Sequence, residues 1–543
     1  MGTTSDREAY IAAGLWSATE TLPTRLATHA VVRGEMVAAV DNVGGSVTYG
    51  ALAQSSVRIA DGLRSRGVGP GDVVGVQMPN RVETVIASAA IEKLGAIVCP
   101  VVPPYREREL DYIVDRTKMK ALFVPGVYRG FDHGGLAKVL ADRYERLGTV
   151  VTLGDLLDDR FVGLQALIEA GSWDPQLAEP ELVPDAPCAI LFTSGTESAP
   201  KGAVHTHNTL LANVRALLQI LDLGADDGVF MASPLGHGTG YGFGIRLAGY
   251  LGSTLSLLDR WEPRAAAAML AEHGAAYTHG ALPFVEDLVN VDGIEKFDLG
   301  KLRYFVTGGA AVPPATVRLA LDRLGCQVLR LYGQTEGFMS TLIQPDDPIE
   351  KLVNTDGRPV AGVELRVVDD NDDDVPVGTS GSLVYRGPHR CIEFFEDPER
   401  TKSSLTTDGW FRSGDLVSVD TDGYLTVTGR SKEVINRGGY KYSPREVEEA
   451  LLGHADVEQV AIVSVPDARL VERACAFVIL RPGGSLDVES AGQYLASLGI
   501  ASFKWPERIE VVESFPMTAS GKIQKYQLAE LVNSCVPPEP TAP

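Results

Sequence analysis

The sequence VVGVQMPNRVETVIASAAIEKLGAIVCPVVPPYRERELDYIVDRTKMKALFVPG (residues 73–126) alternates short apolar runs with longer stretches of mixed polarity. The runs VVGVQM, AIVCPVV and ALFVPG are rich in branched apolar residues, which suit buried strands, and the stretches between them are helix-like. Strands separated by helices are typical of a parallel sheet covered by helices. We therefore predict an α/β unit over residues 49–183.

The same alternation resumes after Lys201. It continues through an alanine-rich helix at 264–273 and through strands near Tyr304 and Val328. A second α/β unit is therefore expected in the middle of the chain.

Between residues 357 and 429 the pattern changes to short runs broken by Gly, Asp and Pro, as in ELRVVDDNDDDVPVGTSGSLVYRG. This pattern predicts the hairpins of an all-β subdomain. The acidic run DDNDDD (369–374) is best read as a solvated turn, because its carboxylates lack the spacing of a metal-binding loop.

After Gly429 the pattern is α+β again, with a helix starting near Pro444 and strands at 459–465 and 474–480. The segment GRSKEVINRGG (429–439) has glycines, which permit positive φ, and few apolar residues to anchor it. We predict a hinge there.

Composition limits the function. The chain has 543 residues, so at least two domains are expected, and its formal net charge of −22 argues against a nucleic-acid partner. The six cysteines are scattered without a CxxC pair, which fits reduced thiols. The sequence has neither a signal-like amino terminus nor an apolar run of about 18 residues, and we expect a cytoplasmic protein without a membrane span.

The segment LFTSGTESAPKG (191–202) follows a predicted strand with small hydroxylic residues and glycines, and ends in Pro-Lys-Gly. Its backbone amides, the hydroxyls of Thr193, Ser194 and Thr196, and the cation of Lys201 suit phosphate oxygens. The segment does not match the GxxxxGK[ST] pattern of a P-loop. Taken alone, it is better explained by a flexible surface loop.

Two further segments supply groups that could bind a nucleotide; the first follows a predicted strand, and the second places an aspartate after a glycine. YGQTEG (332–337) offers the ring of Tyr332 to stack on a base and the carboxylate of Glu336 to hold Mg²⁺. WFRSGDL (410–416) supplies Asp415, which can accept hydrogen bonds from both ribose hydroxyls. Taken alone, Glu336 is better explained as a polar turn residue, whereas Asp415 is equally well explained as the cap of a turn.

In this order, TSGTESAPKG, YGQTE, WFRSGDL, GRSKEVINRGGYKYSPREVE and PMTASGK resemble the acyl-adenylate-forming superfamily, which holds acyl-CoA synthetases, adenylation domains of peptide synthetases and beetle luciferases. The resemblance covers essentially the whole chain. It implies an AMP-binding domain of two α/β subdomains and a small β-barrel over residues 1–430 and a mobile α+β domain over 431–535. It also implies an AMP-forming acid–thiol ligase that uses ATP, Mg²⁺ and coenzyme A. The last residues, VPPEPTAP (536–543), are proline-rich and polar, and we expect them to be a disordered tail.

The resemblance gives roles to residues that match the family's motifs. Thr335 and Glu336 would face the phosphates and magnesium, and Lys522 would reach the α-phosphate while the acyl-adenylate forms. The residues that would bind ATP or AMP are Thr193, Ser194, Gly195, Thr196, Lys201, Gly308, Gly309, Ala310, Tyr332, Gly333, Asp415 and Arg430.

The resemblance further implies that one site is rebuilt between two half-reactions. The smaller domain would rotate about Lys432. That rotation would bring the turn GGYK, with Gly438, Gly439 and Tyr440, to the site, where its glycines leave room for the pantetheine arm of coenzyme A.

The segment SPLGHGTGYGFG (233–244) resembles the region that contacts the acid, with His237 near the carboxylate. The sequence is most similar by eye to the cyclohexanecarboxylate-CoA ligase and 2,3-dihydroxybenzoate-AMP ligase branch. Hydroxybenzoate enzymes place Asn after that histidine, whereas this chain has Gly238, so we expect a less polar cyclic, aryl or short aliphatic acid. The expected pocket residues are His237, Gly238, Tyr241, Thr278, His279, Gly280 and Ala281; Tyr241, Thr278, His279 and Ala281 fit core positions equally well.

The chain departs from the family in its phosphate loop, where Glu197 and Ser198 replace Thr and Gly. A carboxylate facing pyrophosphate would repel it, so we expect Glu197 to face outward or to pair with a cation.

Two other readings stay open. The acyl acceptor is either coenzyme A or a carrier-protein thiol. The protein could also be a non-catalytic nucleotide-binding regulator, although such a protein would be expected to lose Lys522 or Glu336, and both are present. We expect the protein to be a monomer or a homodimer.

Overall fold

The computed structural model describes residues 4–171, 181–193, 200–309, 312–430, 433–437, 440–467, 470–498, 500–518 and 522–534. The chain divides into two compact units, which are described separately. The larger unit holds Met1–Thr193, Pro200–Glu364 and Arg386–Ser404, and the smaller unit holds Leu365–Tyr385 and Leu405–Pro543.

Two mixed sheets organise the larger unit. The first has the order β18 (Arg358–Pro359), β17 (Thr341–Leu342), β16 (Gln327–Tyr332), β15 (Tyr304–Gly308), β14 (Ala275–His279), β12 (Gly228–Met231), β13 (Leu255–Leu257), β1 (Val37–Asp41), β2 (Ser46–Thr48). The second has the order β21 (Glu393–Phe394), β11 (Lys201–Thr206), β10 (Pro187–Thr193), β4 (Ile97–Pro100), β3 (Val73–Val76), β5 (Ala121–Val124), β8 (Thr149–Thr152), β9 (Phe161–Gly163).

The centres of both sheets are parallel. Strands β16, β15, β14, β12, β13 and β1 run parallel in the first sheet, and β10, β4, β3, β5, β8 and β9 run parallel in the second. The strands predicted in 73–126 are β3, β4 and β5, and those predicted near Tyr304 and Val328 are β15 and β16. The α/β prediction is confirmed.

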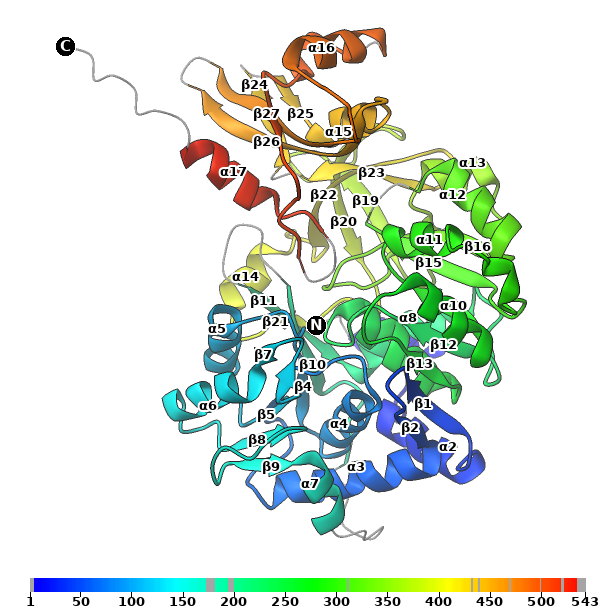
Figure 1. Ribbon diagram of the computed structural model, residues 1–543, viewed down its shortest axis with the longest axis vertical. Coiled ribbons are helices and arrows are strands. Elements are labelled where there is room, and N and C mark those ends of the chain that lie inside the picture. Colours follow the sequence, from blue (N-terminus) through cyan, green and yellow to red (C-terminus); the bar gives the residue numbers. More distant parts are fainter. Residues whose placement is uncertain are drawn as a thin grey trace, which may run out of the picture. The chain divides into compact units, whose positions relative to one another are not determined.

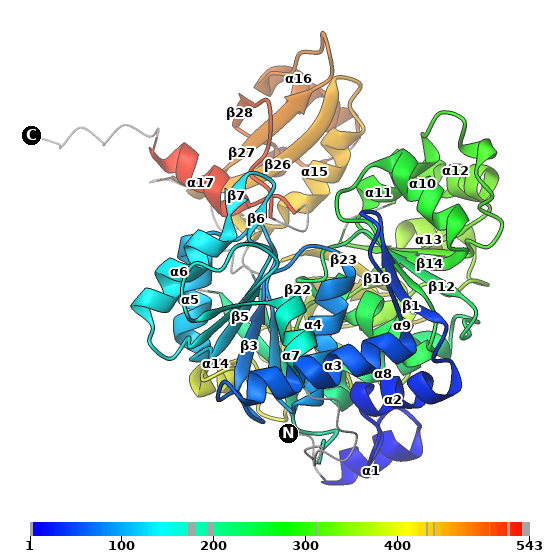
Figure 2. The same ribbon diagram turned by 60° about the horizontal axis from the view of Figure 1, so that its bottom comes forward.

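Helices cover and separate the sheets of the larger unit (Figures 1 and 2). They are α1 (Thr4–Ala12), α2 (Leu22–Val32), α3 (Tyr49–Arg64), α4 (Val82–Lys93), α5 (Glu107–Thr117), α6 (His133–Arg143), α7 (Leu164–Ala170), α8 (His207–Leu218), α9 (Leu247–Leu251), α10 (Pro263–Glu272), α11 (Leu282–Val289), α12 (Pro314–Leu319), α13 (Ile349–Asn354) and α14 (Pro398–Ser403). A π-helical turn, η1 (Gly240–Arg246), precedes α9.

The surroundings of helix α4 explain why its sequence is mostly apolar. Its residues from Val82 to Glu92 are almost all buried, because the helix contacts β3 and β4 of one sheet and β1 of the other. A helix enclosed by two layers has no solvent-facing side. Glu92, a carboxylate in this setting, therefore needs an internal partner.

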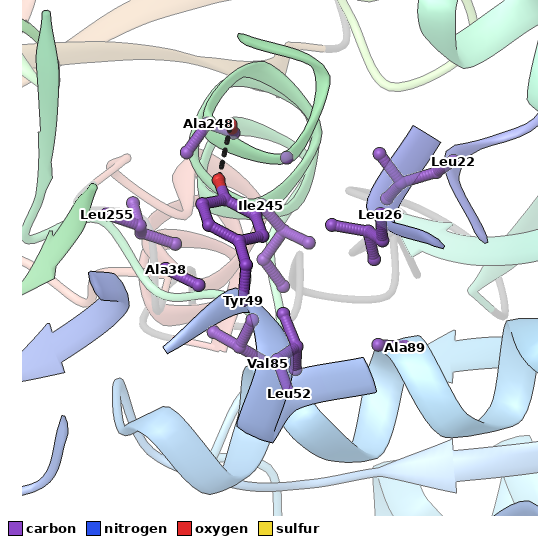
Figure 3. Close-up of a pocket in the computed structure, with 11 residues that line it drawn as sticks. Leu22, Leu26, Ala38, Tyr49, Leu52, Val85, Ala89, Ile245, Ala248 and Leu255 are labelled. Atoms are coloured by element: carbon purple, nitrogen blue, oxygen red, sulfur yellow. Dashed lines mark hydrogen bonds between the residues drawn. The ribbon is translucent and has the colours of Figure 1, made fainter. Parts of the chain in front are cut away.

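A small apolar cavity of about 20 Å³ lies among α2, α3, α4 and α9 (Figure 3). Its lining includes Leu22, Leu52 and Val85, and the hydroxyl of Tyr49 donates to the carbonyls of Ala248 and Ser253 at 3.1 and 2.7 Å. An apolar space of this size is expected to stay dry. It contains none of the predicted acid-binding residues.

The smaller unit begins with an antiparallel sheet of β19 (Glu364–Val368), β20 (Gly381–Arg386), β22 (Phe411–Val419) and β23 (Leu425–Arg430). The predicted short strands are present, but residues 357–429 are not one all-β subdomain, because the stretch includes the helix α14 and because β18 and β21 pair with strands of the larger unit. The described residues form an open four-stranded sheet and no closed ring, so the small barrel stays a prediction. The acidic run folds as a turn whose Asp372 and Asp374 pair with Arg412 and Arg366 at 2.6 and 2.7 Å.

The rest of the smaller unit is a second sheet with helices. Its elements are β24 (Ile435–Arg437), β25 (Tyr440–Tyr442), α15 (Pro444–Leu452), β26 (Val457–Asp467), β27 (Val471–Leu480), α16 (Val488–Ser497), β28 (Arg508–Val511) and α17 (Lys525–Ser534). Ser443 caps α15 and Pro444 occupies its first turn, which explains why the helix begins there. The predicted helix from Pro444 and the predicted strands are confirmed.

Over the ranges that the structure describes, no helix is long and apolar enough to cross a membrane. The predicted tail (536–543) lies outside those ranges.

Candidate functional site

Most predicted site residues of the larger unit follow the carboxyl ends of neighbouring parallel strands. Gly308 ends β15 and Tyr332 ends β16, and the two strands pair with Gly308 opposite Leu331. His279 ends β14, and His237 follows β12. In open α/β sheets, ligands bind outside this edge.

The turn after β16 needs its glycine. A Cβ on Gly333 would lie 1.4 Å from the carbonyl oxygen of Phe338, so no larger residue fits without moving the backbone. The side-chain amide of Gln334 donates to the Tyr332 hydroxyl at 3.0 Å, and the Tyr332 side chain is mostly buried. The chain thereby presents residues 335 and 336 in one fixed turn.

Thr335 and Glu336 are held from the second sheet. The Nε2 of His205, on β11, lies 2.9 Å from the carbonyl oxygen of Thr335, and the Cys391 amide donates to the carbonyl oxygen of Glu336 at 2.7 Å. Burial, opposed by the hydrogen bond to Thr335, lowers the pKa of His205 to about 4. The neutral ring donates through Nε2 at neutral pH.

The side chain of Glu336 faces Lys201. Lys201 Nζ lies 3.6 Å from Glu336 Oε1, and Lys201 pairs in register with Thr193 across β10 and β11. The Glu336 carboxylate is almost buried, whereas about a third of the Lys201 side chain is exposed. The structure thus brings together three predicted phosphate-site residues: a hydroxyl, an ammonium and a carboxylate.

This donor set fits magnesium bound together with phosphates. Mg²⁺ takes one or two protein carboxylates and completes its shell with water and substrate oxygens. Among the described residues no group of three or more His, Cys, Asp or Glu is arranged to hold a metal by itself. The almost buried Glu336 therefore suits a Mg²⁺ that arrives with a nucleotide.

The predicted acid-binding segment packs against aromatic rings. A Cβ on Gly238 would lie 3.7 Å from the Phe338 ring, and the Phe243 ring lies 6.1 Å from that of Phe338 and 4.7 Å from that of His279. Gly242 lies closest of all, since a Cβ there would approach Phe338 to 2.3 Å.

The two histidines of this segment differ in burial. His237 is half-buried, and its Nδ1 accepts the Thr239 amide at 3.2 Å. His279 is buried, and burial together with the nearby His237 lowers the pKa of His279 to about 3. The buried His279 ring is therefore neutral at neutral pH.

Phe243, Phe338 and His205 were missed from the sequence. Phe338 directly follows the YGQTEG motif and has φ of 45°, which is rare for a bulky residue. The available signal was its position next to the motif. No sequence pattern predicts that the Phe338 ring lies beside Gly238, which is a hundred residues earlier.

Tyr241 lies in the core, in a buried polar cluster that the sequence did not indicate. Its hydroxyl donates to Glu92 Oε1 at 2.8 Å, and Arg246 binds both oxygens of Glu92 at 2.8 and 2.7 Å. His207 Nδ1 is 3.8 Å from Glu92, and burial and the charge of Arg246 lower the pKa of His207 well below its usual value. Of the two readings left open for Tyr241, the structure favours the core.

In the smaller unit, the predicted ribose residues are neighbours. Asp415 and Arg430 are paired across β22 and β23, and Arg430 Nε lies 3.2 Å from Asp415 Oδ1. Asp415 is mostly buried, whereas Arg430 is about half exposed. Gly414 has φ of 79°, which explains the glycine before this aspartate.

Lys522 is exposed at the end of a short loop in the smaller unit. Tyr440 lies on β25, opposite Arg437 of β24. Several predicted residues lie outside the described residues: Ser194, Gly195, Thr196, Glu197, Ser198, Ala310, Lys432, Gly438 and Gly439.

Comparison with known proteins gives matches over nearly the whole chain. A family model described as AMP-binding enzyme matches residues 26–391, and one described as AMP-binding enzyme C-terminal domain matches residues 446–522. The chain is 35% identical to the medium-chain fatty-acid–CoA ligase of Escherichia coli K12, over 96% of this chain and 92% of the relative. It is 30% identical to the 2,3-dihydroxybenzoate-AMP ligase of Bacillus subtilis 168, over 97% and 96%.

Solved structures agree. ATP-bound MatB from Rhodopseudomonas palustris superposes with a TM-score of 0.84 at 26% identity, covering 94% of this chain and 99% of MatB.

Proposed function

The chain belongs to the AMP-binding enzyme family, and from this premise we propose that it is an ATP-dependent acid:thiol ligase. It joins a carboxylic acid to AMP with release of pyrophosphate, and then transfers the acyl group to coenzyme A. The observation that carries the proposal is the meeting of Thr193, Lys201 and Glu336 beside the carboxyl ends of β15 and β16.

In the first half-reaction, an oxygen of the acid attacks the α-phosphorus, and the bond from that phosphorus to the pyrophosphate oxygen breaks. No general base is required, because the acid is already ionised at neutral pH. The main barrier is the repulsion between two anions. Mg²⁺, when bound, adds positive charge to the phosphates.

The chain's own residues do the rest of this step. We assign Lys201 and the Thr193 hydroxyl to the phosphates, and Lys522 to the α-phosphate and the acid's carboxylate. Fixed charges and donors aimed at the reacting phosphate supply much of an enzyme's rate enhancement. Tyr332 with Gly308 and Gly309 is assigned to the adenine, and Asp415 with Arg430 to the ribose.

In the second half-reaction, the thiol sulfur attacks the acyl carbonyl carbon, its proton passes to solvent, and the bond to the AMP oxygen breaks. Gly438, Gly439 and Tyr440 are assigned to the pantetheine arm, and Lys432 to the hinge. The domain boundaries after residues 430 and 535, a cytoplasmic location and a monomeric or homodimeric state remain predictions from the sequence.

We propose a weakly polar acid: cyclic, aryl or aliphatic. Phe243, Phe338 and the neutral His279 supply an apolar surface, and Gly238 offers no polar side chain to a ring hydroxyl. Aliphatic acids are included because the Escherichia coli relative is named a medium-chain fatty-acid–CoA ligase.

The test is acid-dependent exchange of pyrophosphate into ATP, measured over a panel of cyclic, aryl and aliphatic acids, followed by thioester formation with and without coenzyme A. We expect exchange with at least one weakly polar acid, and thioester only when coenzyme A is added. Absence of exchange with every acid would reject the ligase, and exchange without transfer to coenzyme A would shift the acceptor to a carrier-protein thiol.

A further inference from the structure

The loop that carries Lys522 is closed at its base. Met517 and Ile523 form an isolated β-bridge, and the Gln524 amide donates to the Pro516 carbonyl at 2.8 Å. Inside this base, the Thr518 amide donates to the Lys522 carbonyl at 2.7 Å. The backbone position of Lys522 therefore follows the position of the loop base.

Lys525 comes directly after that base, as the first residue of α17. Its ammonium lies 2.9 Å from a carboxylate oxygen of Glu433 and 2.9 Å from one of Glu448. Burial alone would lower the pKa of Lys525, but the two carboxylates outweigh burial and raise it. Lys525 is therefore a charged group held by two partners.

The two carboxylates belong to different elements. Glu433 stands one residue after Lys432, the predicted hinge, and two residues before β24. Glu448 lies on α15, and its carboxylate also accepts the Ile462 amide of β26. Lys525 thus ties the base of the Lys522 loop both to the first described residue after the hinge and to the sheet of the smaller unit.

We propose that Lys525 is a positioning residue, which makes the Lys522 loop and the hinge-side segment at Glu433 move as one body. This inference rests on the proposed function. A rotation about Lys432 then delivers Lys522 to one defined place, because the strand leaving the hinge and the loop base are joined through one ammonium. Without that ammonium, two carboxylates would face each other across the same gap and repel, and the loop base would lose its connection to Glu433.

The chain offers a matched control in Lys504. Its ammonium pairs with Glu446, which lies on α15 as Glu448 does. The side chains of Lys504 and Lys525 are 21% and 22% exposed, so their removal changes a similar amount of surface. The ion pair of Lys504 with Glu446 does not involve the loop of residues 516–524.

The experiment compares Lys525→Met, Lys525→Arg and Lys504→Met in the full chain, with Lys522→Ala as the reference for complete loss of the lysine. Acid-dependent pyrophosphate exchange measures adenylation, and thioester formation from a supplied acyl-adenylate and coenzyme A measures the second step. Thermal melting records stability.

We expect Lys525→Met to lower the maximal rate of exchange by about 10²-fold, the scale of a 1 Å misplacement of a reacting group, with thioester formation changed less than about threefold. Lys525→Arg should restore most of the exchange, because a guanidinium can bind both carboxylates. Lys504→Met should leave both half-reactions near their original rates.

Equal loss of both half-reactions in Lys525→Met, or equal behaviour of the Lys525→Met and Lys504→Met variants, would overturn the proposal. If Lys525→Met does not fold, Glu433→Gln replaces it and must weaken exchange selectively. The wild-type protein separates the two hypotheses: wild type without exchange rejects the ligase itself, whereas active wild type with unselective variants rejects only the role of Lys525.

Discussion

Two glutamates of the larger unit, Glu92 and Glu336, each face a cation inside the protein, yet they do so in opposite ways. Glu92 receives two hydrogen bonds from Arg246 and one from Tyr241, all at 2.7–2.8 Å, and Glu92 and Arg246 are at most 1% exposed. Glu336 has Lys201 at 3.6 Å, and the Lys201 side chain is 35% exposed.

The difference indicates two purposes. Glu92 has its charge neutralised and its oxygens occupied by the protein, so the cluster joins α4 to η1 and leaves nothing to offer a ligand. The Lys201–Glu336 pair is too long for a strong hydrogen bond and is reached by solvent on the lysine side. The first pair is a structural contact inside the fold, whereas the second suits a ligand with phosphates and a metal ion.

The largest expected effect comes from breaking the Glu92–Arg246 pair, which is closed to solvent and is called the closed pair below. Arg246→Met leaves the Glu92 carboxylate buried without its cation, so the free energy of unfolding should fall by about 3–5 kcal/mol. Denaturant unfolding measures it. The double variant Glu92→Met with Arg246→Met should be more stable than Arg246→Met alone, since no unpaired charge remains; a double variant that is less stable than the single one would contradict this account.

The Lys201–Glu336 pair, called the open pair, is reached by solvent. A change in this pair should lower activity and should alter stability much less. Glu336→Gln keeps the size of the side chain and removes its charge, so acid-dependent pyrophosphate exchange should fall by about 10²–10³-fold, the range for removal of one preorganised group. Its melting temperature should stay close to that of the wild type. A variant that unfolds easily yet exchanges normally would show that the two pairs have the same purpose.

The two pairs also show which features of the structure can be predicted from the sequence. Local order predicts the strands β3, β4, β5, β15 and β16, because each is an apolar run between helical segments. The motif residues Lys201 and Glu336 could be predicted because each ends a recognisable segment. Their contact could not, since it joins two sheets through residues more than a hundred positions apart.

The closed pair was missed for a related reason. Glu92 lies in a mostly apolar helix that also contains Glu83 and Lys93, and Arg246 lies in a glycine-rich apolar segment, so each position hints at an internal charge. Neither signal names its partner. Tyr241 was accordingly predicted as a pocket wall or a core residue, and only the fold separates the two.

Each pair also has a buried histidine next to it, which makes the fold sensitive to acid. An unfolded histidine binds a proton below about pH 6.5, whereas His205, beside Thr335, does so only near pH 4. Between these values the unfolded state holds the extra proton, so stability falls as the pH is lowered. His205→Gln keeps an N–H donor and should reduce this slope by about 1.4 kcal/mol per pH unit.

Denaturant unfolding at several pH values from 7 to 4 measures that slope. His207, beside Glu92, remains in the variant and should maintain part of the pH dependence. A slope unchanged by His205→Gln would mean that His205 is already protonated in the folded protein.

The smallest effect concerns the wall of the acid pocket, where the question is again whether the protein supplies a polar partner. A Cβ on Gly238 meets the Phe338 ring at 3.7 Å and Leu191 at 3.8 Å, which are ordinary contacts, so Gly238→Asn can be accommodated. Its amide would offer one hydrogen bond to an ortho hydroxyl, worth about 1 kcal/mol. Exchange with 2-hydroxybenzoate relative to benzoate should therefore rise by about fivefold. Gly238→Ala, which adds bulk without a polar group, should not raise that ratio. An equal rise in both variants would show that the size of the side chain at residue 238, and not a hydrogen bond, sets the preference.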